Sequence, residues 1–289
     1  MKVALFERAD GTRSIGEVHG DEIHDLGEWV GSNHGCLLAA YLSRVAQVPK
    51  PVSPPKLLTL HSVRLLPPAL GATAIYCVGV NYAAHARSVA ERTGTEFDPS
   101  ASPALFMKTW TALTGHDTPI IRPRVSDWFD FEGELVVIIG LPCRAVHRKD
   151  ALRYVAGYSI GIDGSVRDWQ RKLPTPTAGK NFAKSGSMGP WMVTADEISD
   201  PAKLRVITRL DGQVFQDAPT SELINDVAAL IEHISTFTTL MPGDVIFTGT
   251  PAGCLADRGN DRWLKPGELV TVEIPGIGTL SNIVADEPA

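Results

Sequence analysis

The chain has 289 residues, a formal net charge of −6 and an apolar content of 44%. This composition is typical of a folded protein with a sizeable core and argues against a disordered chain. The negative charge, and the lack of a basic stripe with interleaved aromatic residues, argue against a nucleic-acid partner. The first apolar stretch is too short for a signal peptide and no later one has the length of a membrane span, so we expect a cytoplasmic protein without a membrane partner.

The cysteines are far apart in the sequence and form no C-x-x-C pair; they are Cys36, Cys77, Cys143 and Cys254. Such spacing is not that of a disulfide framework or of a cysteine-based zinc site. We therefore expect four reduced thiols.

The first 48 residues predict a small α+β unit, with strands over residues 2–7 and 14–19 and a helix at about residues 36–48. Six prolines follow between Pro49 and Pro68. Because proline lacks the amide proton and fixes φ, this stretch predicts an extended connector. We place a domain boundary here.

The predicted division gives a small N-terminal domain with its proline-rich linker over residues 1–68 and a larger domain over residues 69–289. A chain of this length suits one large domain or a small one plus a larger one.

Residues 129–140 read F-D-F-E-G-E-L-V-V-I-I-G and predict a buried strand that begins with acidic residues. Side chains two apart in a strand point to the same face, so Asp130, Glu132 and Glu134 are expected side by side. Buried carboxylates need a compensating positive charge. From the strand alone, a divalent metal ion and simple hydration at a frayed strand end are equally compatible with this pattern.

A second strand-like run, within residues 154–170, ends at Asp163 and breaks at Gly164. An acidic residue where a buried strand turns is a common position for a metal ligand. Together with Glu132 and Glu134 it would form an oxygen-only site. Such ligands suit Mg²⁺, Mn²⁺ or Ca²⁺ rather than zinc, and three protein ligands leave positions open for water or substrate.

Polar residues follow this second run, namely Arg167, Asp168 and Gln170, with Lys180 in the later segment A-G-K-N-F. A lysine and a glutamine near a metal ion could hold a carboxylate or keto oxygen and balance developing charge. For either residue considered singly, an ordinary position in a solvated surface loop is the favoured interpretation.

Further along, the sequence alternates strands with turn signals, and Asp211-Gly212 predicts a tight hairpin. One helix interrupts them, with Thr220 or Ser221 as its N-cap. Its apolar residues recur at helical spacing, which indicates core packing; they are Leu223, Ile224, Val227, Leu230, Ile231 and Ile234. The pattern alone predicts a β-rich α+β protein.

Seven segments, in order from about Ala74 to the C-terminus, together resemble the fumarylacetoacetate hydrolase family. They are V-G-V-N-Y-A-A-H (78–85), D-F-E-G-E-L-V-V-I-I-G (130–140), G-I-D-G-S-V-R-D-W-Q (161–170), A-G-K-N-F (178–182), M-G-P-W (188–191), M-P-G-D-V-I-F-T-G-T-P-A-G (241–253) and I-P-G-I-G-T-L-S-N (274–282). The resemblance implies a C-terminal catalytic domain of mixed, rolled β-sheets, a small N-terminal domain and a homodimer.

The same resemblance implies metal-dependent chemistry, with Mg²⁺, Mn²⁺ or Ca²⁺, on small 2-oxo acids or 1,3-dicarbonyl compounds. Glu132, Glu134 and Asp163 match the metal ligands. Among the remaining matches, Lys180 and Gln170 act on the substrate and the water or oxyanion, Arg167 and Thr250 bind the substrate, and Gly249 and Gly253 let the backbone approach it. Asp130 matches a variable position beside the ligands.

His85 matches the histidine that deprotonates the attacking water in hydrolytic members, where a glutamate one helical turn later supports it. Here Ser88 occupies that position. Glu91 is poorly spaced for the same helical contact. Glu96 and Asp98 follow in residues 93–103, a polar segment typical of a mobile lid. A serine can orient an imidazole but cannot stabilise imidazolium as a carboxylate does.

Three functions therefore stay open at this point. The first is a metal-dependent hydrolase that cleaves a C–C bond of an acylpyruvate-like or fumarylacetoacetate-like compound, as in the catabolism of aromatic compounds. The second is a decarboxylase, isomerase or hydratase of a 2-oxo acid, which needs the same metal but no water-activating pair. The third is a non-catalytic metal-binding scaffold.

Overall fold

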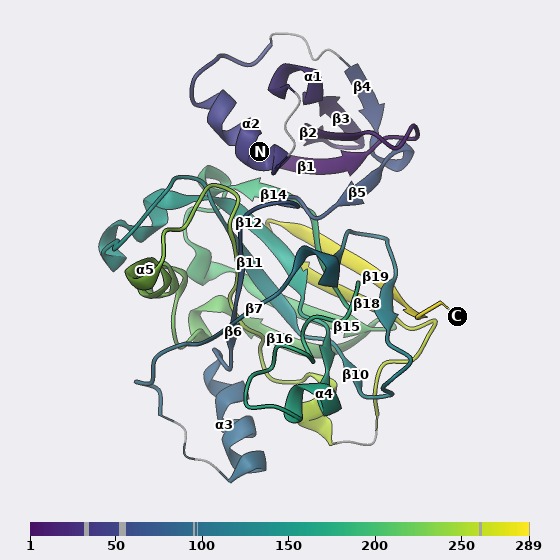
Figure 1. Ribbon diagram of the computed structural model, residues 1–289, viewed down its shortest axis with the longest axis vertical. Coiled ribbons are helices and arrows are strands. Elements are labelled where there is room, and N and C mark those ends of the chain that lie inside the picture. Colours follow the sequence, from purple (N-terminus) through teal and green to yellow (C-terminus); the bar gives the residue numbers. More distant parts are fainter. Residues whose placement is uncertain (32–34, 52–55, 95, 97, 260–261, 289) are drawn as a thin grey trace.

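The computed structural model describes residues 1–31, 35–51, 56–94, 96, 98–259 and 262–288. It is a β-rich α+β fold, as the sequence predicts (Figure 1). Pro54 and Pro55, and two positions of the predicted lid, Thr95 and Phe97, lie outside the described residues.

One large mixed sheet runs through the molecule. Its strand order is β4 (Lys56–Thr59), β3 (Glu22–Asp25), β2 (Arg13–His19), β1 (Lys2–Glu7), β14 (Gly186–Thr194), β12 (Val155–Ile162), β11 (Gly133–Ile139), β17 (Val245–Phe247), β6 (Ile75–Gly79) and β7 (Ala104–Met107). Two short strands pair beside this path, β5 (Arg64–Leu66) with β1 and β8 (Leu113–Thr114) with β14.

The N-terminal strands therefore continue the same sheet, because β1 pairs antiparallel with β14. Within the described part of the proline-containing stretch, residues 56–59 and 64–66 are extended and paired, since β4 adds to β3 and β5 adds to β1, with the 3₁₀ turn of residues 60–62 between them. Figure 1 shows these N-terminal elements as a small lobe above the larger body. The domain division after residue 68 stays a prediction.

A second sheet of five strands packs against the first. Its order is β16 (Gln213–Pro219), β15 (Arg205–Leu210), β18 (Leu269–Ile274), β19 (Gly278–Asp286) and β9 (Ile120–Arg122). The predicted hairpin joins β15 to β16, and both turn residues, Asp211 and Gly212, have positive φ (49° and 80°). That backbone is the one a two-residue hairpin turn requires.

Strand β11 is buried on both faces, which explains its unbroken aliphatic sequence. Leu135, Val137 and Ile139 pack in the cluster that includes the second sheet. Val136 and Ile138 point the other way, into the cluster shared with the N-terminal elements. The period of two along a strand thus divides the core into two layers.

The described residues form few helices. They are α1 (Gly27–Val30), α2 (Leu37–Val45), α3 (Ala83–Thr93), α4 (Arg167–Arg171) and α5 (Val227–Phe237). Short 3₁₀ turns add η1 (Leu60–Ser62), η2 (Trp110–Ala112), η3 (Arg148–Tyr154), η4 (Ala195–Glu197), η5 (Pro201–Lys203), η6 (Thr220–Glu222) and η7 (Leu255–Arg258).

The N-cap predicted for the α5 helix is wrong. Asp226 caps it, since its side chain accepts the backbone N–H of Ala229. Ile224 and Asn225, just before the helix, are bound by Asn81: the backbone N–H of Ile224 donates to the Asn81 carbonyl and that of Asn225 to its side chain. A tertiary contact thus sets the start of this helix.

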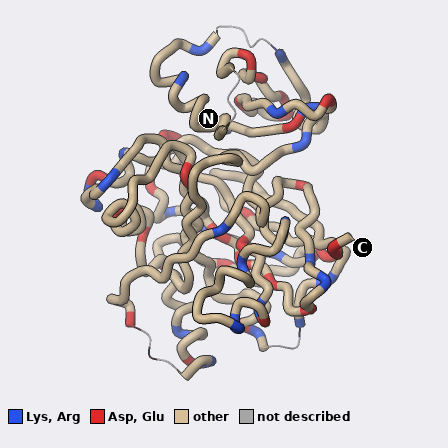
Figure 2. The backbone as a smooth tube through the Cα atoms, viewed as in Figure 1, with Lys and Arg blue, Asp and Glu red and all other residues tan. Residues whose placement is uncertain are grey.

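No helix among the described residues has the length and apolar character needed to cross a lipid bilayer. In the view of Figure 2, acidic and basic positions are interspersed over the body of the molecule.

Candidate functional site

The acidic segment of residues 129–140, which the sequence predicts as one strand, forms two strands, and these two strands contribute to the site. β10 (Phe129–Asp130) pairs with β13 (Ser165–Val166), whereas Glu134 lies on β11. Glu132 sits between the two strands, and its carbonyl accepts the backbone N–H of Asp163 (2.8 Å). Glu132, Glu134 and Asp163 are buried, and their carboxylate oxygens lie within 4.8 Å of one another. The predicted triad is therefore brought together.

Two of the three carboxylates have cationic partners. Lys180 Nζ lies 2.5 Å from Glu132 Oε2 and 2.8 Å from Asp163 Oδ2, and Lys108 Nζ lies 2.6 Å from Asp163 Oδ1. Arg167 Nη1 lies 2.7 Å from Glu132 Oε1. Against the effect of burial, Lys180 and Arg167 lower the pKa of Glu132 to about 2. These side chains supply the compensation that the strand itself lacks.

Glu134 is different. Its carboxylate accepts the backbone N–H of Gly249 (2.6 Å). Burial and the carboxylates of Asp163 and Glu132 raise the pKa of Glu134 well above its ordinary value. A divalent cation among the three carboxylates would remove this repulsion. The donor set, oxygen-only and buried, fits a hard ion such as Mg²⁺, Mn²⁺ or Ca²⁺.

Lys180 is held by the same carboxylates. Burial lowers the pKa of Lys180, but Asp163 and Glu132 outweigh it and raise that pKa above its ordinary value. The side chain thus stays an ammonium, placed to face negative charge beside the triad. Lys108, buried next to it, also donates to the Lys180 carbonyl. Nothing in the sequence around Lys108 indicates this position.

Arg167 crosses from α4 to the acidic residues. Its Nε donates to Asp130 Oδ2 (2.8 Å), and its Nη1 donates to Gln170 Oε1 (3.0 Å). Asp130 is fully buried and also accepts the backbone N–H groups of Leu255 and Ala256 (2.9 and 3.1 Å). Asp130 therefore holds both Arg167 and the turn η7.

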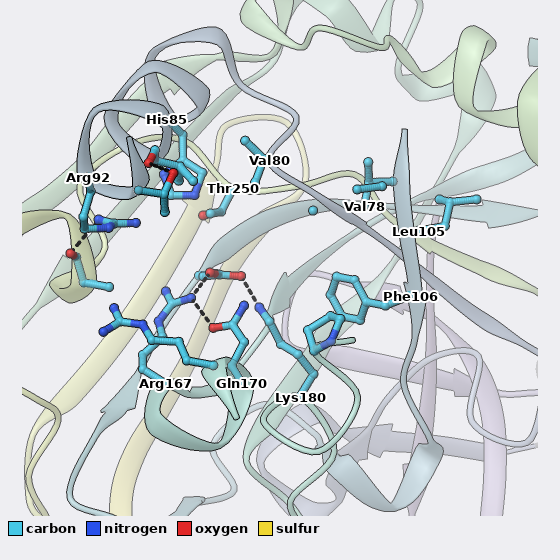
Figure 3. A pocket seen from close by; sticks show the side chains of 18 of the residues that line it. Val78, Val80, His85, Arg92, Leu105, Phe106, Arg167, Gln170, Lys180 and Thr250 are labelled. Carbon is cyan, nitrogen blue, oxygen red and sulfur yellow. Dashed lines mark hydrogen bonds and ion pairs between the residues drawn. The ribbon is translucent and has the colours of Figure 1, made fainter. Parts of the chain in front are cut away.

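A cavity of about 390 Å³ opens beside the triad. His85 and Thr250 lie above it in Figure 3, with Arg167, Gln170 and Lys180 opposite. One side is apolar, formed by side chains that include Val78, Val80, Leu105 and Phe106. Glu132 also lines the cavity, so a ligand in it would contact one carboxylate of the triad and most of the other polar residues that the sequence predicts.

The loop after β17 brings Thr250 to the cavity wall. Its Oγ1 donates to the Gly133 carbonyl (2.9 Å) and accepts from Gln216 (2.8 Å). Gly249 has φ +98°, and a Cβ there would lie 2.8 Å from the Cβ of Asn81. Gly253 has φ +111°. The backbone conformation therefore requires glycine at both positions, and the backbone N–H of Gly249 donates to the Glu134 carboxylate.

His85 has a carboxylate partner that the sequence does not reveal. Its Nδ1 lies 3.0 Å from Asp257 Oδ2, and both side chains are buried. The expectation that Ser88 leaves His85 without a carboxylate partner is therefore wrong. Ser88 instead lies on the far side of the same carboxylate, with its Oγ 3.4 Å from Asp257 Oδ1. A separation of 172 residues leaves no local signal for this pair.

The chain is similar to known proteins over most of its length. Residues 74–285 match the family model described as fumarylacetoacetate (FAA) hydrolase C-terminal. Protein Rv2993c of Mycobacterium tuberculosis is 42% identical over 78% of this chain and 80% of its own length. Oxaloacetate tautomerase FAHD2A of Bos taurus is 36% identical over 77% of this chain and 69% of its own.

Among solved structures, the fumarylacetoacetate hydrolase of Exiguobacterium antarcticum superposes with a TM-score of 0.86 at 33% identity. The superposition covers 99% of this chain and 100% of that one. Other matches carry the names of isomerases and of an isomerase/decarboxylase. The shared fold thus supports more than one reaction.

Proposed function

The chain belongs to the fumarylacetoacetate hydrolase family, and from this premise we propose that it is a metal-dependent hydrolase of C–C bonds in small 1,3-dicarbonyl 2-oxo acids. One observation carries the proposal: His85, with a carboxylate on its Nδ1, lines the same cavity as Glu132 and Lys180. A base beside a cation site is the combination that hydrolysis of such a bond requires.

Glu132, Glu134 and Asp163 would hold the ion, with Mg²⁺, Mn²⁺ or Ca²⁺ suited to them. When bound, the ion supplies a Lewis acid that favours negative charge on the 2-oxo acid part of the substrate. Thr250 and Arg167 line the cavity where the substrate carboxylate would be held.

His85 is the proposed base. Its Nε2 accepts a proton from water as the water oxygen bonds to the distal carbonyl carbon. The C–C bond then breaks, its electron pair passes to the 2-oxo acid fragment, and the imidazolium returns the proton to the carbon of that fragment. The Lys180 ammonium and the Gln170 amide face the charge that develops during these steps. The apolar wall excludes water from the remainder of the cavity.

A second candidate is tautomerisation of a 2-oxo acid, favoured by the 36% identity to an oxaloacetate tautomerase. In that reaction His85 would move a proton between carbon and oxygen without adding water. Both candidates use the same ion and base, and they differ in whether water attacks the distal carbonyl carbon.

For the assembly, we propose a homodimer, which light scattering would test.

The deciding experiment compares acetylpyruvate with oxaloacetate, each with Mg²⁺ and with EDTA. We expect Mg²⁺-dependent cleavage of acetylpyruvate to acetate and pyruvate, with loss of turnover in EDTA and in His85→Ala. Turnover of oxaloacetate alone would favour the tautomerase. Activity that persists in EDTA would contradict the metal site, and inactivity on every 2-oxo acid would favour a binding scaffold.

A further inference from the structure

Val80 has an uncommon backbone conformation at the wall of the cavity beside the carboxylate triad. Its φ is +54°, in the left-handed region, where a β-branched side chain crowds the neighbouring backbone. The side chain is apolar and 42% exposed, and Figure 3 draws it among the groups that line this cavity. A glycine would adopt the same backbone without strain. A valine at this position therefore carries a conformational cost that a glycine would not.

The residues on either side hold this backbone in place. Gly79 is the last residue of β6 and pairs with Ala104 of β7. Asn81 is buried, and its side-chain amide donates to the carbonyls of Thr248 (2.8 Å) and Asn225 (2.9 Å). The turn between these two anchors fixes the direction of the side chain at position 80, and the surrounding contacts maintain its strained backbone.

A second cavity, of about 250 Å³, adjoins the first at Val80. The two cavities share the lining residues Gly79, Val80, Val89 and Ala104. Glycine and alanine present little side chain at this boundary. Val80, just after β6, and Val89, on α3, therefore form most of it, and we call these two side chains the valine partition.

The lining of the second cavity indicates what could enter it. Ala86, Ala90 and Ile224 give it apolar surface, and Glu96 and Asp98 give it negative charge. An uncharged hydrocarbon chain suits such a lining. A chain that ends in a carboxylate would be repelled by the two acidic side chains.

We propose that Val80 is a specificity-determining residue: with Val89 it separates the two cavities, so that the protein selects substrates with a short acyl group. The proposal rests on the proposed function, since it concerns the distal end of the 2-oxo acid substrate. With its 2-oxo acid end beside Glu132 and Lys180, a lengthening acyl group along the apolar wall meets the valine partition. Opening the partition would admit longer uncharged acyl groups to the second cavity.

Val80→Ala and Val80→Gly test the proposal because they remove the branched side chain. We expect the wild type to prefer acetylpyruvate to hexanoylpyruvate, and both variants to raise the ratio of kcat/KM for hexanoylpyruvate over acetylpyruvate by roughly ten-fold or more. Val89→Ala should change the ratio in the same direction. Val214→Ala, at a similarly exposed valine of β16 outside both cavities, is the matched control and should leave the ratio unchanged.

Two further measurements need no turnover. Val80→Gly should have a higher thermal midpoint than Val80→Ala, because glycine relieves the left-handed backbone and alanine does not. Ala145→Gly, at an exposed position with φ +51°, isolates this backbone effect and should raise the midpoint without changing the acyl-chain ratio. Calorimetry with Mg²⁺ should show that Val80→Gly binds 2-oxooctanoate about ten-fold more tightly than the wild type does, with 2-oxobutanoate unchanged.

The outcomes separate this proposal from the proposed function. Cleavage of acylpyruvates with an unchanged chain-length ratio in both Val80 variants would overturn the role of Val80. A wild type that cleaves no acylpyruvate, with a Val80→Gly variant that gains affinity for 2-oxooctanoate, would contradict the proposed function and support the partition. A higher midpoint for Val80→Ala than for Val80→Gly would contradict the strain at this position. An equal gain for adipoylpyruvate, which has the same chain length as hexanoylpyruvate but ends in a carboxylate, would overturn the preference for uncharged groups.

Discussion

The carboxylate triad and the His85–Asp257 pair meet at one cavity, but they are assembled in opposite ways. The triad comes from the ends of two hydrogen-bonded strands, β11 and β12, and from the link between β10 and β11. The pair joins residues separated by 172 positions, one on a helix and one on a 3₁₀ turn. The triad can therefore be recognised from the sequence patterns of its strands, whereas the pair is recognised only in the folded structure.

Their electrostatics differ as well. In the triad, burial and neighbouring carboxylates raise the pKa of Glu134. In the pair, burial is outweighed by the hydrogen bond and charge of His85, which lower the pKa of Asp257. The first region gains from a bound cation, and the second is already satisfied by groups of the chain itself. Substitutions in the triad and in the His85–Asp257 pair should therefore have different effects on metal binding and stability.

The largest effect is expected at Glu134. Glu134→Gln removes one ligand charge, and we expect Mg²⁺ affinity and turnover to fall by more than about 10²-fold, beyond the loss typical of groups that only orient a ligand. In metal-free protein the same change relieves repulsion, so the thermal midpoint should stay equal or rise. Calorimetry with and without Mg²⁺ measures the metal affinity and the thermal midpoint, and steady-state kinetics measures turnover.

Glu132→Gln is the matched comparison for Glu134→Gln. It also removes a ligand charge, but it breaks contacts to Lys180 and Arg167 and should lower the metal-free midpoint. Equal metal-free midpoints for the two variants would contradict the difference drawn between these carboxylates.

The next effect concerns Lys180. Lys180→Met removes the ammonium that faces developing charge, and we expect kcat to fall by roughly 10²-fold, with a smaller change in KM. Steady-state kinetics measures this split, and Lys203→Met, at an exposed position, serves as control. An altered KM with normal kcat would place Lys180 outside the chemical steps.

The smallest effect is a pH dependence of stability at Asp257. The folded-state pKa of this carboxylate is lowered, so its contribution is full above its unfolded pKa of about 4 and is lost as pH falls toward the folded value. We expect Asp257→Asn to cost roughly 1.5–3 kcal/mol of unfolding free energy at pH 7. The gap to wild type should narrow below pH about 4 in urea titrations, and a gap independent of pH would contradict this assignment.

The sequence predicts the secondary structure best where the pattern is local. The buried strand β11 and the Asp211-Gly212 turn are both found, because an aliphatic run and turn geometry depend on neighbouring residues. The start of α5 is mispredicted because Asn81, far away in the sequence, binds the preceding residues. The paired state of β4 and β5 also depends on distant strands.

By itself, the sequence determined the family, the β-rich fold and the carboxylates that gather at the strand ends. Strand spacing places such residues together, and seven motifs in order carry the resemblance. Only the tertiary structure decided which charges compensate them and which carboxylate supports His85. Lys108 and Asp257 have no local signature, because a buried ion pair needs only two groups meeting in space, and chain folding rather than sequence spacing sets that meeting.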